Sequence, residues 1–526
     1  MRLLIVSNRL PYSVQINEEG LSFKKSPGGL VSGLTSYLKS DQLAECEFVW
    51  IGWPGQSIPE EWQRQLIERS AKEFQSYPVF LSEDAMENFY HGFCNSTIWP
   101  LFHYFPSYAT FNPEHWQHYK EVNRIFCDAV LKIAEPDDLI WIHDYHLMLL
   151  PEMLRERLPE ASIGFFLHIP FPSFEVFRVL PKTWRAGILI GMLGADLIGF
   201  HTHHFTQYFL RCVLRILGYE HSSGQITIGN RVAVADTFPM GIEFNKIQEV
   251  AKEDVVVQEY SALRQSFGDR KVIISVDRLD YSKGIINRLQ GYEIFLEKNP
   301  EWHDLVILLL VVVPSRIGVE HYQLMKQQID EMVGKVNGKF GTISWTPIVY
   351  QYRSLDFEPL VALYRASDIA LITPLRDGMN LISKEYVASR VDETGVLILS
   401  EMAGASSELG EAITINPNNR EEIADSLFEA LQMPDYEQKR RIKMMQNRLE
   451  HYDVIHWASE FLKRLNSIKE IQNEMASRFL NRANRQEFIE SYKRASNRLF
   501  LQDYDGTLVP YAPTPEGAKP STNVLN

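Results

Sequence analysis

Short runs of apolar residues recur along the chain, and each is followed by a turn signal and then by apolar positions at helical spacing. These runs are Leu3–Val6, Phe48–Ile51, Leu139–Ile142, Ile163–Leu167, Leu197–Phe200, Val272–Val276, Val306–Val313, Ile369–Ile372 and Val396–Leu399. Continuous apolar strands that alternate with helices are typical of parallel sheets whose two faces are both covered. The pattern therefore predicts an α/β protein.

These strands are too many for one compact sheet, so the sequence predicts two α/β domains. The join is expected near Pro239 to Lys252, after the apolar stretch Ala233–Phe238. The stretch from Tyr436 to about Asn473 is rich in Lys, Arg, Glu and Leu and predicts long helices that close the second domain. The expected domains are residues 1–245, 246–475 and 476–526, the last being a linker and the start of a further domain.

The composition narrows the class of protein. The chain has 526 residues, of which 45% are hydrophobic and 23% charged, which excludes disordered, collagen-like and disulfide-scaffold classes. Lys and Arg number 53 against 67 Asp and Glu, so the formal net charge is −14, which argues against a nucleic-acid partner. The longest apolar run, Val306–Val313, is too short to span a membrane. Small anionic ligands fit if basic residues gather in a cleft.

The four cysteines form no CxxC pair, so the sequence predicts reduced thiols and neither structural zinc nor a disulfide framework. The first apolar run starts like a signal peptide, but Ser7, Asn8 and Arg9 interrupt it after four residues. We therefore expect a cytoplasmic protein without a membrane partner. A homo-oligomer is compatible with the sequence, which does not show the contact surface.

Polar residues follow two strands of the first half. Arg9 ends the first strand, and the paired glycines of Pro27–Leu30 let backbone N–H groups approach a ligand closely. Asp144 ends another strand between His143 and His146. This carboxylate can bind sugar hydroxyls or move a proton, the three side chains can hold a metal ion, or the loop is simply stabilised by its own hydrogen bonds. His168 follows a neighbouring strand in the same half.

In the second half, cations follow the strands. Arg278 ends one strand and Lys283 precedes the next helix, an arrangement suited to a diphosphate. A surface pair between Arg278 and Asp280 is the alternative. Arg316 follows the longest strand as a third cation.

The block Pro374–Glu385 carries a Gly-bearing loop and then a helix. Its backbone N–H groups can hold phosphate, Asp377 can accept sugar hydroxyls and Glu385 can accept ribose hydroxyls. An ordinary Asp-Gly turn that caps a helix is the alternative. No GxGxxG follows the first strand and no GxxxxGK[ST] occurs, so dinucleotide and P-loop sites lose their main support.

Taken together and in this order, these blocks resemble the retaining glycosyltransferases that make trehalose 6-phosphate. The resemblance extends from Arg2 to about Leu465 and is carried by Gly28–Leu34, Tyr90–Phe93 with Trp99–Pro100, Trp141–Leu147, Phe166–Pro172, Ser275–Gly284 and Thr373–Glu385. It implies the GT-B architecture, in which two Rossmann-like parallel-sheet domains face each other across a cleft. That architecture agrees with the two domains expected from the strand pattern.

The resemblance implies transfer of glucose from UDP-glucose to glucose 6-phosphate, which gives α,α-trehalose 6-phosphate and UDP. It implies that glucose 6-phosphate is held by Arg9, Tyr90, Trp99, Asp144 and Arg316. The implied UDP-glucose site is Gly28, Gly29, His168, Arg278, Lys283, Leu355, Asp377, Gly378, Met379, Asn380, Leu381, Ile382, Ser383, Lys384 and Glu385. The implied catalytic residues are Asp144, His168, Arg278, Lys283 and Asp377.

By the same resemblance we expect front-face attack, with the departing diphosphate oxygen taking the acceptor proton. Arg278 and Lys283 would stabilise the developing charge by on the order of 3 kcal/mol for each donor. We expect no cofactor and no metal, because these cations replace it and no DxD motif lies between the domains. Two alternatives stay open: another acceptor such as glycerol 3-phosphate, and a sugar-phosphate-binding regulatory protein without turnover.

The C-terminal tail has its own motif. Leu499–Gln502 predicts a strand, and Asp503–Thr507 resembles the first motif of haloacid-dehalogenase-type phosphatases, with Asp503 as nucleophile, Asp505 as general acid and magnesium as cofactor. The remaining Leu508–Asn526 cannot supply the later motifs or a core. We therefore expect an incomplete phosphatase start and no phosphatase activity from this chain.

Overall fold

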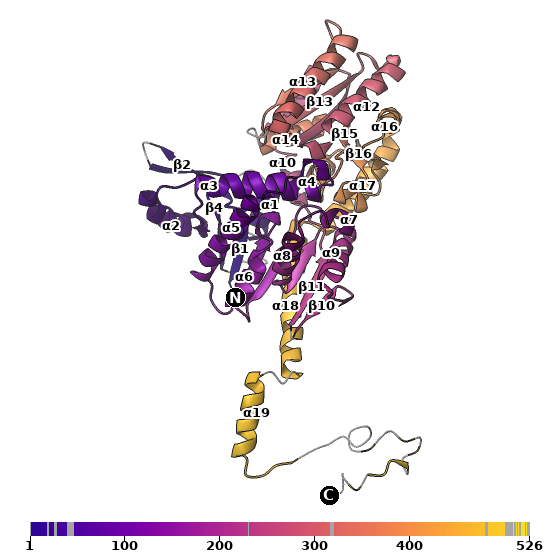
Figure 1. The fold of residues 1–526 in the computed structure, drawn as a ribbon. Helices are drawn as coiled ribbons and strands as arrows, with labels where there is room; N and C mark the ends of the chain where they lie inside the picture. Colours follow the sequence, from indigo (N-terminus) through magenta and orange to yellow (C-terminus); the bar gives the residue numbers. More distant parts are fainter. Residues whose placement is uncertain are drawn as a thin grey trace. The chain divides into compact units, whose positions relative to one another are not determined.

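The computed structural model describes residues 2–17, 20–25, 29–38, 47–229, 231–315, 320–478 and 482–499, together with 509, 512, 514, 517–520 and 522. They form two units, Met1–Glu470 and Ile471–Asn526. The first unit contains two large sheets with helices on both faces, one from each half of the chain (Figure 1). This is the two-sheet α/β arrangement that the strand pattern predicts.

The first sheet has the strand order β5-β4-β1-β6-β7-β8-β11-β10-β9. Its strands are β1 (Leu3–Arg9), β4 (Phe48–Trp53), β5 (Ser76–Pro78), β6 (Leu139–His143), β7 (Ser162–Phe166), β8 (Leu197–Phe200), β9 (His221–Ser222), β10 (Gln225–Ile228) and β11 (Arg231–Thr237). All pairs are parallel except those of the β11-β10-β9 edge. The carboxyl ends of β1, β6 and β7 therefore lie at one rim.

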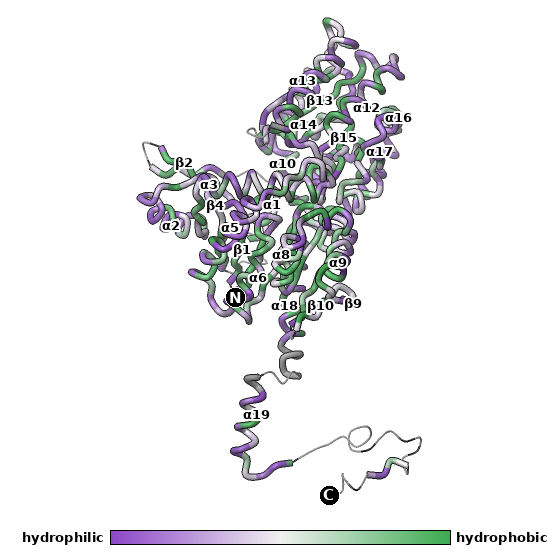
Figure 2. The backbone as a smooth tube through the Cα atoms, viewed as in Figure 1, coloured by the Kyte–Doolittle hydropathy of each residue, from purple (hydrophilic) through white to green (hydrophobic). Residues whose placement is uncertain are grey.

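The second sheet has the order β14-β13-β12-β15-β16-β17, with every pair parallel. Its strands are β12 (Lys271–Arg278), β13 (Val306–Val313), β14 (Ile348–Tyr352), β15 (Ile369–Ile372), β16 (Val396–Ser400) and β17 (Ile413–Ile415). All the apolar runs recognised in the sequence are strands of the two sheets. Hydrophobic residues follow these strands through the interior, as a sheet covered on both faces requires (Figure 2).

Helices cover both sheets. Those of the first half are α1 (Gly29–Leu38), α2 (Glu60–Phe74), α3 (Glu83–Met86), α4 (Trp99–Phe102), α5 (Pro113–Leu131), α6 (Leu150–Arg157), α7 (Phe174–Phe177), α8 (Lys182–Leu193) and α9 (His203–Leu217), with a π-helical stretch, η2 (Glu87–Ile98). Local sequence fixes several starts. Asn112 and Thr202 accept backbone N–H groups at the beginnings of α5 and α9, and Pro113 sits where a helix needs no N–H donor.

The helices of the second half are α10 (Phe244–Val250), α11 (Asp254–Phe267), α12 (Ile285–Lys298), α13 (Glu320–Phe340), α14 (Phe357–Ala366), α15 (Leu381–Ser389), α16 (Arg420–Gln432), α17 (Asp435–His451) and α18 (Val454–Arg478). Short 3₁₀ turns, η4 (Tyr145–Leu147) and η5 (Tyr281–Lys283), follow strand ends in each half.

Helix α18 differs from the expectation. The sequence predicts it as a closing helix of the 246–475 domain, but it packs on the first sheet. The ring of Phe461 stacks on Trp141 of β6 with centroids 4.7 Å apart, and Trp457 also lies against Trp141. Figure 1 shows this yellow helix beside the magenta strands. Its apolar spacing predicted a buried face, but the pattern of one helix does not state which sheet buries it.

The chain therefore crosses between the sheets twice, after β11 and before α18, and the two crossings touch. The N–H of Val454 donates to the carbonyl oxygen of Ile242 at 3.2 Å. A Cβ atom on Gly241 would lie 2.4 Å from the main-chain carbon of Asp453, so only glycine permits this approach.

The described residues also form a hairpin and a further helix outside the two large sheets. An antiparallel hairpin of β2 (Tyr12–Asn17) and β3 (Gly20–Lys25) follows β1 and was not expected. In the second unit, α19 (Arg482–Arg494) is largely hydrophilic (Figure 2). The motif with Asp503 and Asp505 lies outside the described residues, as does most of the strand predicted before it. No helix in the described ranges is long and apolar enough to cross a membrane.

Candidate active site

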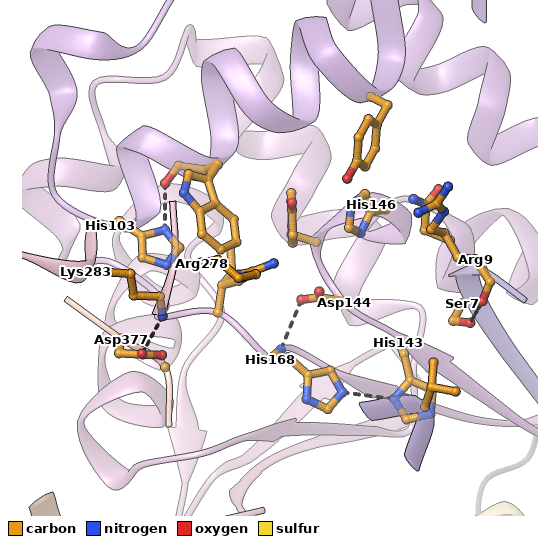
Figure 3. Close-up of a pocket in the computed structure, with 17 residues that line it drawn as sticks. Ser7, Arg9, His103, His143, Asp144, His146, His168, Arg278, Lys283 and Asp377 are labelled. Carbon is orange, nitrogen blue, oxygen red and sulfur yellow. Dashed lines mark hydrogen bonds and ion pairs between the residues drawn. The ribbon is translucent and has the colours of Figure 1, made fainter. Parts of the chain in front are cut away.

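A cavity of about 310 Å³ opens where the carboxyl ends of the strands of the two sheets meet (Figure 3). The first wall, from the first half of the chain, consists of Ser7, Asn8, Arg9, Val31, Tyr90, Trp99, His103, His143, Asp144, Tyr145, His146, His168 and Ile169. The second wall, from the second half, consists of Arg278, Lys283, Asp377 and Gly378. Nine of the residues predicted from the sequence are thus brought together from distant parts of the chain.

Asp144 occupies a strained turn at the end of β6. Its φ is 75°, a left-handed conformation that a non-glycine residue adopts only where surrounding contacts hold it. Its Oδ1 accepts the N–H of His168 at 3.2 Å, and its own N–H donates to the carbonyl oxygen of Phe166 at 2.7 Å. These bonds tie the ends of β6 and β7 together and fix the carboxyl group at the cavity.

Four titratable groups of the first wall, one carboxyl and three imidazoles, are shifted toward their neutral forms. Burial raises the pKa of Asp144 to about 6, against the lowering effect of two backbone N–H groups and of Arg278. Burial also lowers the pKa of His143 and of His168 well below its usual range, and that of His103 to about 4. These imidazoles are therefore neutral near pH 7 and act as hydrogen-bonding groups.

The ring of His168 belongs to an aromatic cluster as well as to the cavity. Its Nε2 lies 3.1 Å from Nδ1 of His143, and its ring packs against Phe166, His201 and Trp457. Figure 3 shows the ring directed toward His143, while the main-chain N–H faces Asp144. The main chain of His168 thus organises the site at least as directly as its side chain does.

The other predicted first-wall residues line the cavity from three separate elements. The exposed guanidinium of Arg9 lies over the ring of Trp53 at 5.0 Å. The ring of Tyr90, on η2, stacks on His146 at 5.7 Å. The indole Nε1 of Trp99 donates to Oδ1 of Asp280 at 3.4 Å, which links the two halves of the chain beside the cavity.

The second wall is ionic. The ammonium of Lys283 pairs with Oδ2 of Asp377 at 2.6 Å, and both side chains are largely buried. Burial would raise the pKa of Asp377, but Lys283 and a hydrogen bond from Asn380 outweigh it and lower this pKa below its usual range. Arg278 is exposed and lies 5.7 Å from the centroid of the Trp99 ring, so its charge is directed at the cavity.

The loop after β15 brings its backbone to the cavity. A Cβ atom on Gly378 would lie 2.3 Å from the carbonyl oxygen of His168, so glycine is needed where the two walls meet. Asn380, with φ 79°, accepts the N–H of Ser383 and caps α15. The beginning of this helix therefore lies directly behind the loop, where its N–H groups favour an anion.

Not every predicted donor residue reaches the cavity. Lys384 is fully buried, and its ammonium donates to the carbonyl oxygen of Met240 and to Glu408, both at 2.8 Å. Glu385 accepts the hydroxyl of Tyr364 at 3.3 Å, and burial raises its pKa to about 6. Four further predicted donor residues pack in or against an apolar core of the second sheet: Leu355, Met379, Leu381 and Ile382.

Two predicted residues, Gly28 and Arg316, lie outside the described residues, and Gly29 is the first residue of α1. Conversely, sequence reasoning did not single out His103, which follows Trp99 by four residues. That spacing returns a side chain to the same face of a helix and was the available signal. In the part of the chain that is described, no group of three or more His, Cys, Asp or Glu side chains is placed to hold a metal ion.

Comparison with known proteins identifies the family of this chain. The sequence profile of glycosyltransferase family 20 matches residues 1–467. The chain belongs to this family. The family assignment agrees with the resemblance found in the sequence, and the structural neighbours share the GT-B arrangement of two parallel-sheet domains.

Several relatives have names that state an activity. A bifunctional trehalose-6-phosphate synthase/phosphatase of Thermoproteus tenax is 46% identical, over all of this chain and 72% of the relative. The UDP-forming α,α-trehalose-phosphate synthase 1 of Aspergillus fumigatus is 44% identical, over 89% of this chain and 90% of the relative.

Two solved structures of the same family fold carry ligands. The Burkholderia xenovorans α,α-trehalose-phosphate synthase in complex with glucose-6-phosphate matches with a TM-score of 0.79 at 32% identity, over 89% of this chain and all of that one. An E. coli structure bound with UDP-2-fluoro glucose matches with a TM-score of 0.78 at 34% identity, over 88% and 99% of the two chains.

Proposed function

We propose that this chain is a UDP-forming α,α-trehalose-phosphate synthase, which transfers glucose from UDP-glucose to glucose 6-phosphate with retention of configuration. One observation carries the proposal: a single cavity joins a wall of hydroxyl-binding and aromatic groups around Asp144 to a wall of cations at Arg278 and Lys283. Two anionic sugars that must react with each other need such a cavity. Relatives that are 41–46% identical, and whose names state this activity, support the same conclusion.

In this proposal the first wall binds glucose 6-phosphate. Arg9 is exposed at the end of β1 and offers a fork of donors to the phosphate, with Arg316 as a second cation. Asp144 accepts a sugar hydroxyl, while Tyr90 and Trp99 enclose the sugar with their rings. The stated complex of the Burkholderia xenovorans relative with glucose-6-phosphate supports the acceptor.

The second wall binds the nucleotide sugar. Arg278 and Lys283 face the diphosphate, and Asp377 with the loop Gly378–Asn380 accepts hydroxyls of the glucosyl unit. Leu355 would contact the base, and Gly28 with Gly29 would close over the sugar. Residues Leu381–Glu385 contribute through the beginning of α15, and Lys384 acts there by holding Met240 and Glu408 in place.

The reaction breaks the bond between the anomeric carbon and the diphosphate oxygen. A hydroxyl oxygen of glucose 6-phosphate attacks the same carbon from the same face, and its proton passes to the departing diphosphate oxygen. Arg278 and Lys283 stabilise the charge that grows on UDP, while the two walls hold both sugars in reacting position. No step requires a metal or a nucleophilic carboxylate, and the metal-free reaction remains a prediction.

Further expectations remain predictions alongside this one. These are the domain limits 1–245, 246–475 and 476–526, apart from the placement of α18, together with the cytoplasmic location, the homo-oligomer, the absence of a nucleic-acid partner, and the lack of phosphatase activity.

The first experiment is to measure UDP release from UDP-glucose by the purified chain with glucose 6-phosphate or glycerol 3-phosphate as acceptor. Rapid release with glucose 6-phosphate alone, giving a non-reducing disaccharide phosphate, is the expected result. Release only with glycerol 3-phosphate would keep the donor site and overturn the acceptor. Binding of either sugar without release would point to a regulatory protein.

A further inference from the structure

His103 is a buried imidazole at the cavity to which the proposed function gives no task. It follows α4, is 3% exposed, and lines the first wall with its ring 4.1 Å from that of Trp99. Figure 3 shows it next to Lys283, at the place where the first wall meets the second.

One hydrogen bond fixes which ring nitrogen of His103 carries the proton. Nδ1 lies 2.8 Å from the main-chain carbonyl oxygen of Trp99, four residues earlier. A carbonyl oxygen only accepts, so Nδ1 must be the N–H donor. Burial holds the pKa of the ring at about 4, so no second proton is bound near pH 7. Nε2 is therefore an unprotonated acceptor.

The groups around the ring do not occupy this acceptor. Its charged neighbours are Asp280, Lys283 and Asp377. The ammonium of Lys283 is bound to Asp377 at 2.6 Å, and Asp280 is itself an acceptor, from Trp99 and from the N–H of Ser282. Among the residues that the structure describes, none forms a hydrogen bond with Nε2. The lone pair on Nε2 repels phosphate oxygens but accepts a hydrogen bond from a hydroxyl group. The ligand group expected at this nitrogen is therefore a hydroxyl.

We propose that Nε2 of His103 accepts a hydrogen bond from a hydroxyl group of the glucosyl unit of the donor. This inference rests on the proposed function and extends its donor site to a residue on the opposite wall. The donor sugar is favoured over the acceptor because Lys283 and Asp377, the neighbours of the ring, belong to the second wall. His103 is thus a binding residue that orients the sugar and discriminates against an anionic group.

A pair of variants separates this bond from the shape of the ring. In His103→Asn the amide can still donate to the carbonyl of Trp99, but it ends near the position of Nδ1. In His103→Gln an amide oxygen reaches the position of Nε2. Binding of UDP-glucose and of UDP is measured for each by calorimetry. We expect the Asn variant to bind UDP-glucose about tenfold more weakly and UDP unchanged, and the Gln variant to recover most of the loss.

Each other result overturns a defined statement. Equal losses for UDP and UDP-glucose, equal losses in the two variants, or no loss in His103→Asn would overturn the inference. Wild-type protein that binds UDP but not UDP-glucose, or neither, would overturn the proposed function first. Normal wild-type binding of UDP-glucose with an unaffected Asn variant would overturn the inference alone.

Discussion

The two walls of the cavity differ in their electrostatics. The first wall holds Asp144 with a pKa near 6 and imidazoles that burial keeps neutral, so apart from the exposed Arg9 it interacts mainly through hydrogen bonds. The second wall holds Arg278 and the buried Lys283–Asp377 pair, in which Lys283 lowers the pKa of the Asp377 carboxyl below its usual range. In the proposed function, the first wall recognises hydroxyl groups and, through Arg9, a phosphate, while the second wall stabilises a charge that develops during reaction.

The largest expected effect comes from removing a charge from the second wall. Lys283→Ala should lower kcat by about 10²–10³-fold, because in the proposed function it removes a cation from the departing diphosphate, and it leaves Asp377 buried without its ionic partner. The rate of UDP release measures this change in kcat. Lys298→Ala is the matched control, since that lysine forms exposed pairs with Glu421 and Asp425, and it should stay within twofold. Equal activity of the two variants would contradict an ionic second wall.

The next effect tests whether the walls must touch. Gly378→Ala adds a methyl group 2.3 Å from the carbonyl oxygen of His168 and should force the walls apart. We expect a fall in kcat of about 10–10²-fold and a destabilisation of about 1–3 kcal/mol, read by urea unfolding. Gly334→Ala, in α13 with nothing within 4 Å, should instead be neutral or slightly stabilising. A fully active Gly378→Ala variant would mean that the contact is dispensable.

A smaller, pH-dependent effect is expected on the first wall. The pKa of Asp144 is raised to about 6, so the ionised acceptor form is complete above pH 7 and falls about tenfold by pH 5. The ratio of kcat/KM for glucose 6-phosphate between wild type and Asp144→Asn should therefore fall as pH is lowered through 6. Taking this ratio cancels the titration of the substrate phosphate, which occurs in the same range. A ratio that does not vary with pH would show that Asp144 is not the titrating group.

The smallest expected effect tests the direct link between the halves. Trp99→Phe keeps an aromatic ring beside His103 but removes the indole N–H that donates to Asp280 at 3.4 Å. We expect KM for glucose 6-phosphate to rise about two- to tenfold with little change in KM for UDP-glucose. A larger change on the donor side would place Trp99 functionally on the second wall.

Much of the fold could be predicted from the sequence, because parallel strands buried on both faces are continuous apolar runs. The hairpin β2–β3 was missed although Tyr12 and Val14 alternate with polar residues, the pattern of a half-buried strand. The short edge strand β17 has three residues, and a run of this length does not differ from a loop. The packing partner of α18 could not be predicted from the sequence, because a periodic apolar face does not identify the surface that covers it.

Site residues could be predicted from the sequence where they end strands, but less well where they lie inside a helix. Arg9, Asp144 and Arg278 reach the cavity because the strand ends of each sheet share one rim. The run Leu381–Glu385 was assigned to the donor as a block, but successive helical residues point about 100° apart. Lys384 accordingly faces the interior, where Met240 and Glu408 bind it.

The contact between Gly241 and Asp453 has a mechanical consequence. Both covalent connections between the halves pass through this point, where Val454 is hydrogen-bonded to Ile242. The two halves are joined by two neighbouring chain segments. They can rotate about the line through these segments far more easily than they can slide or separate. A rotation of the halves about this point would widen the cavity and leave both chain connections and the Val454–Ile242 hydrogen bond in place.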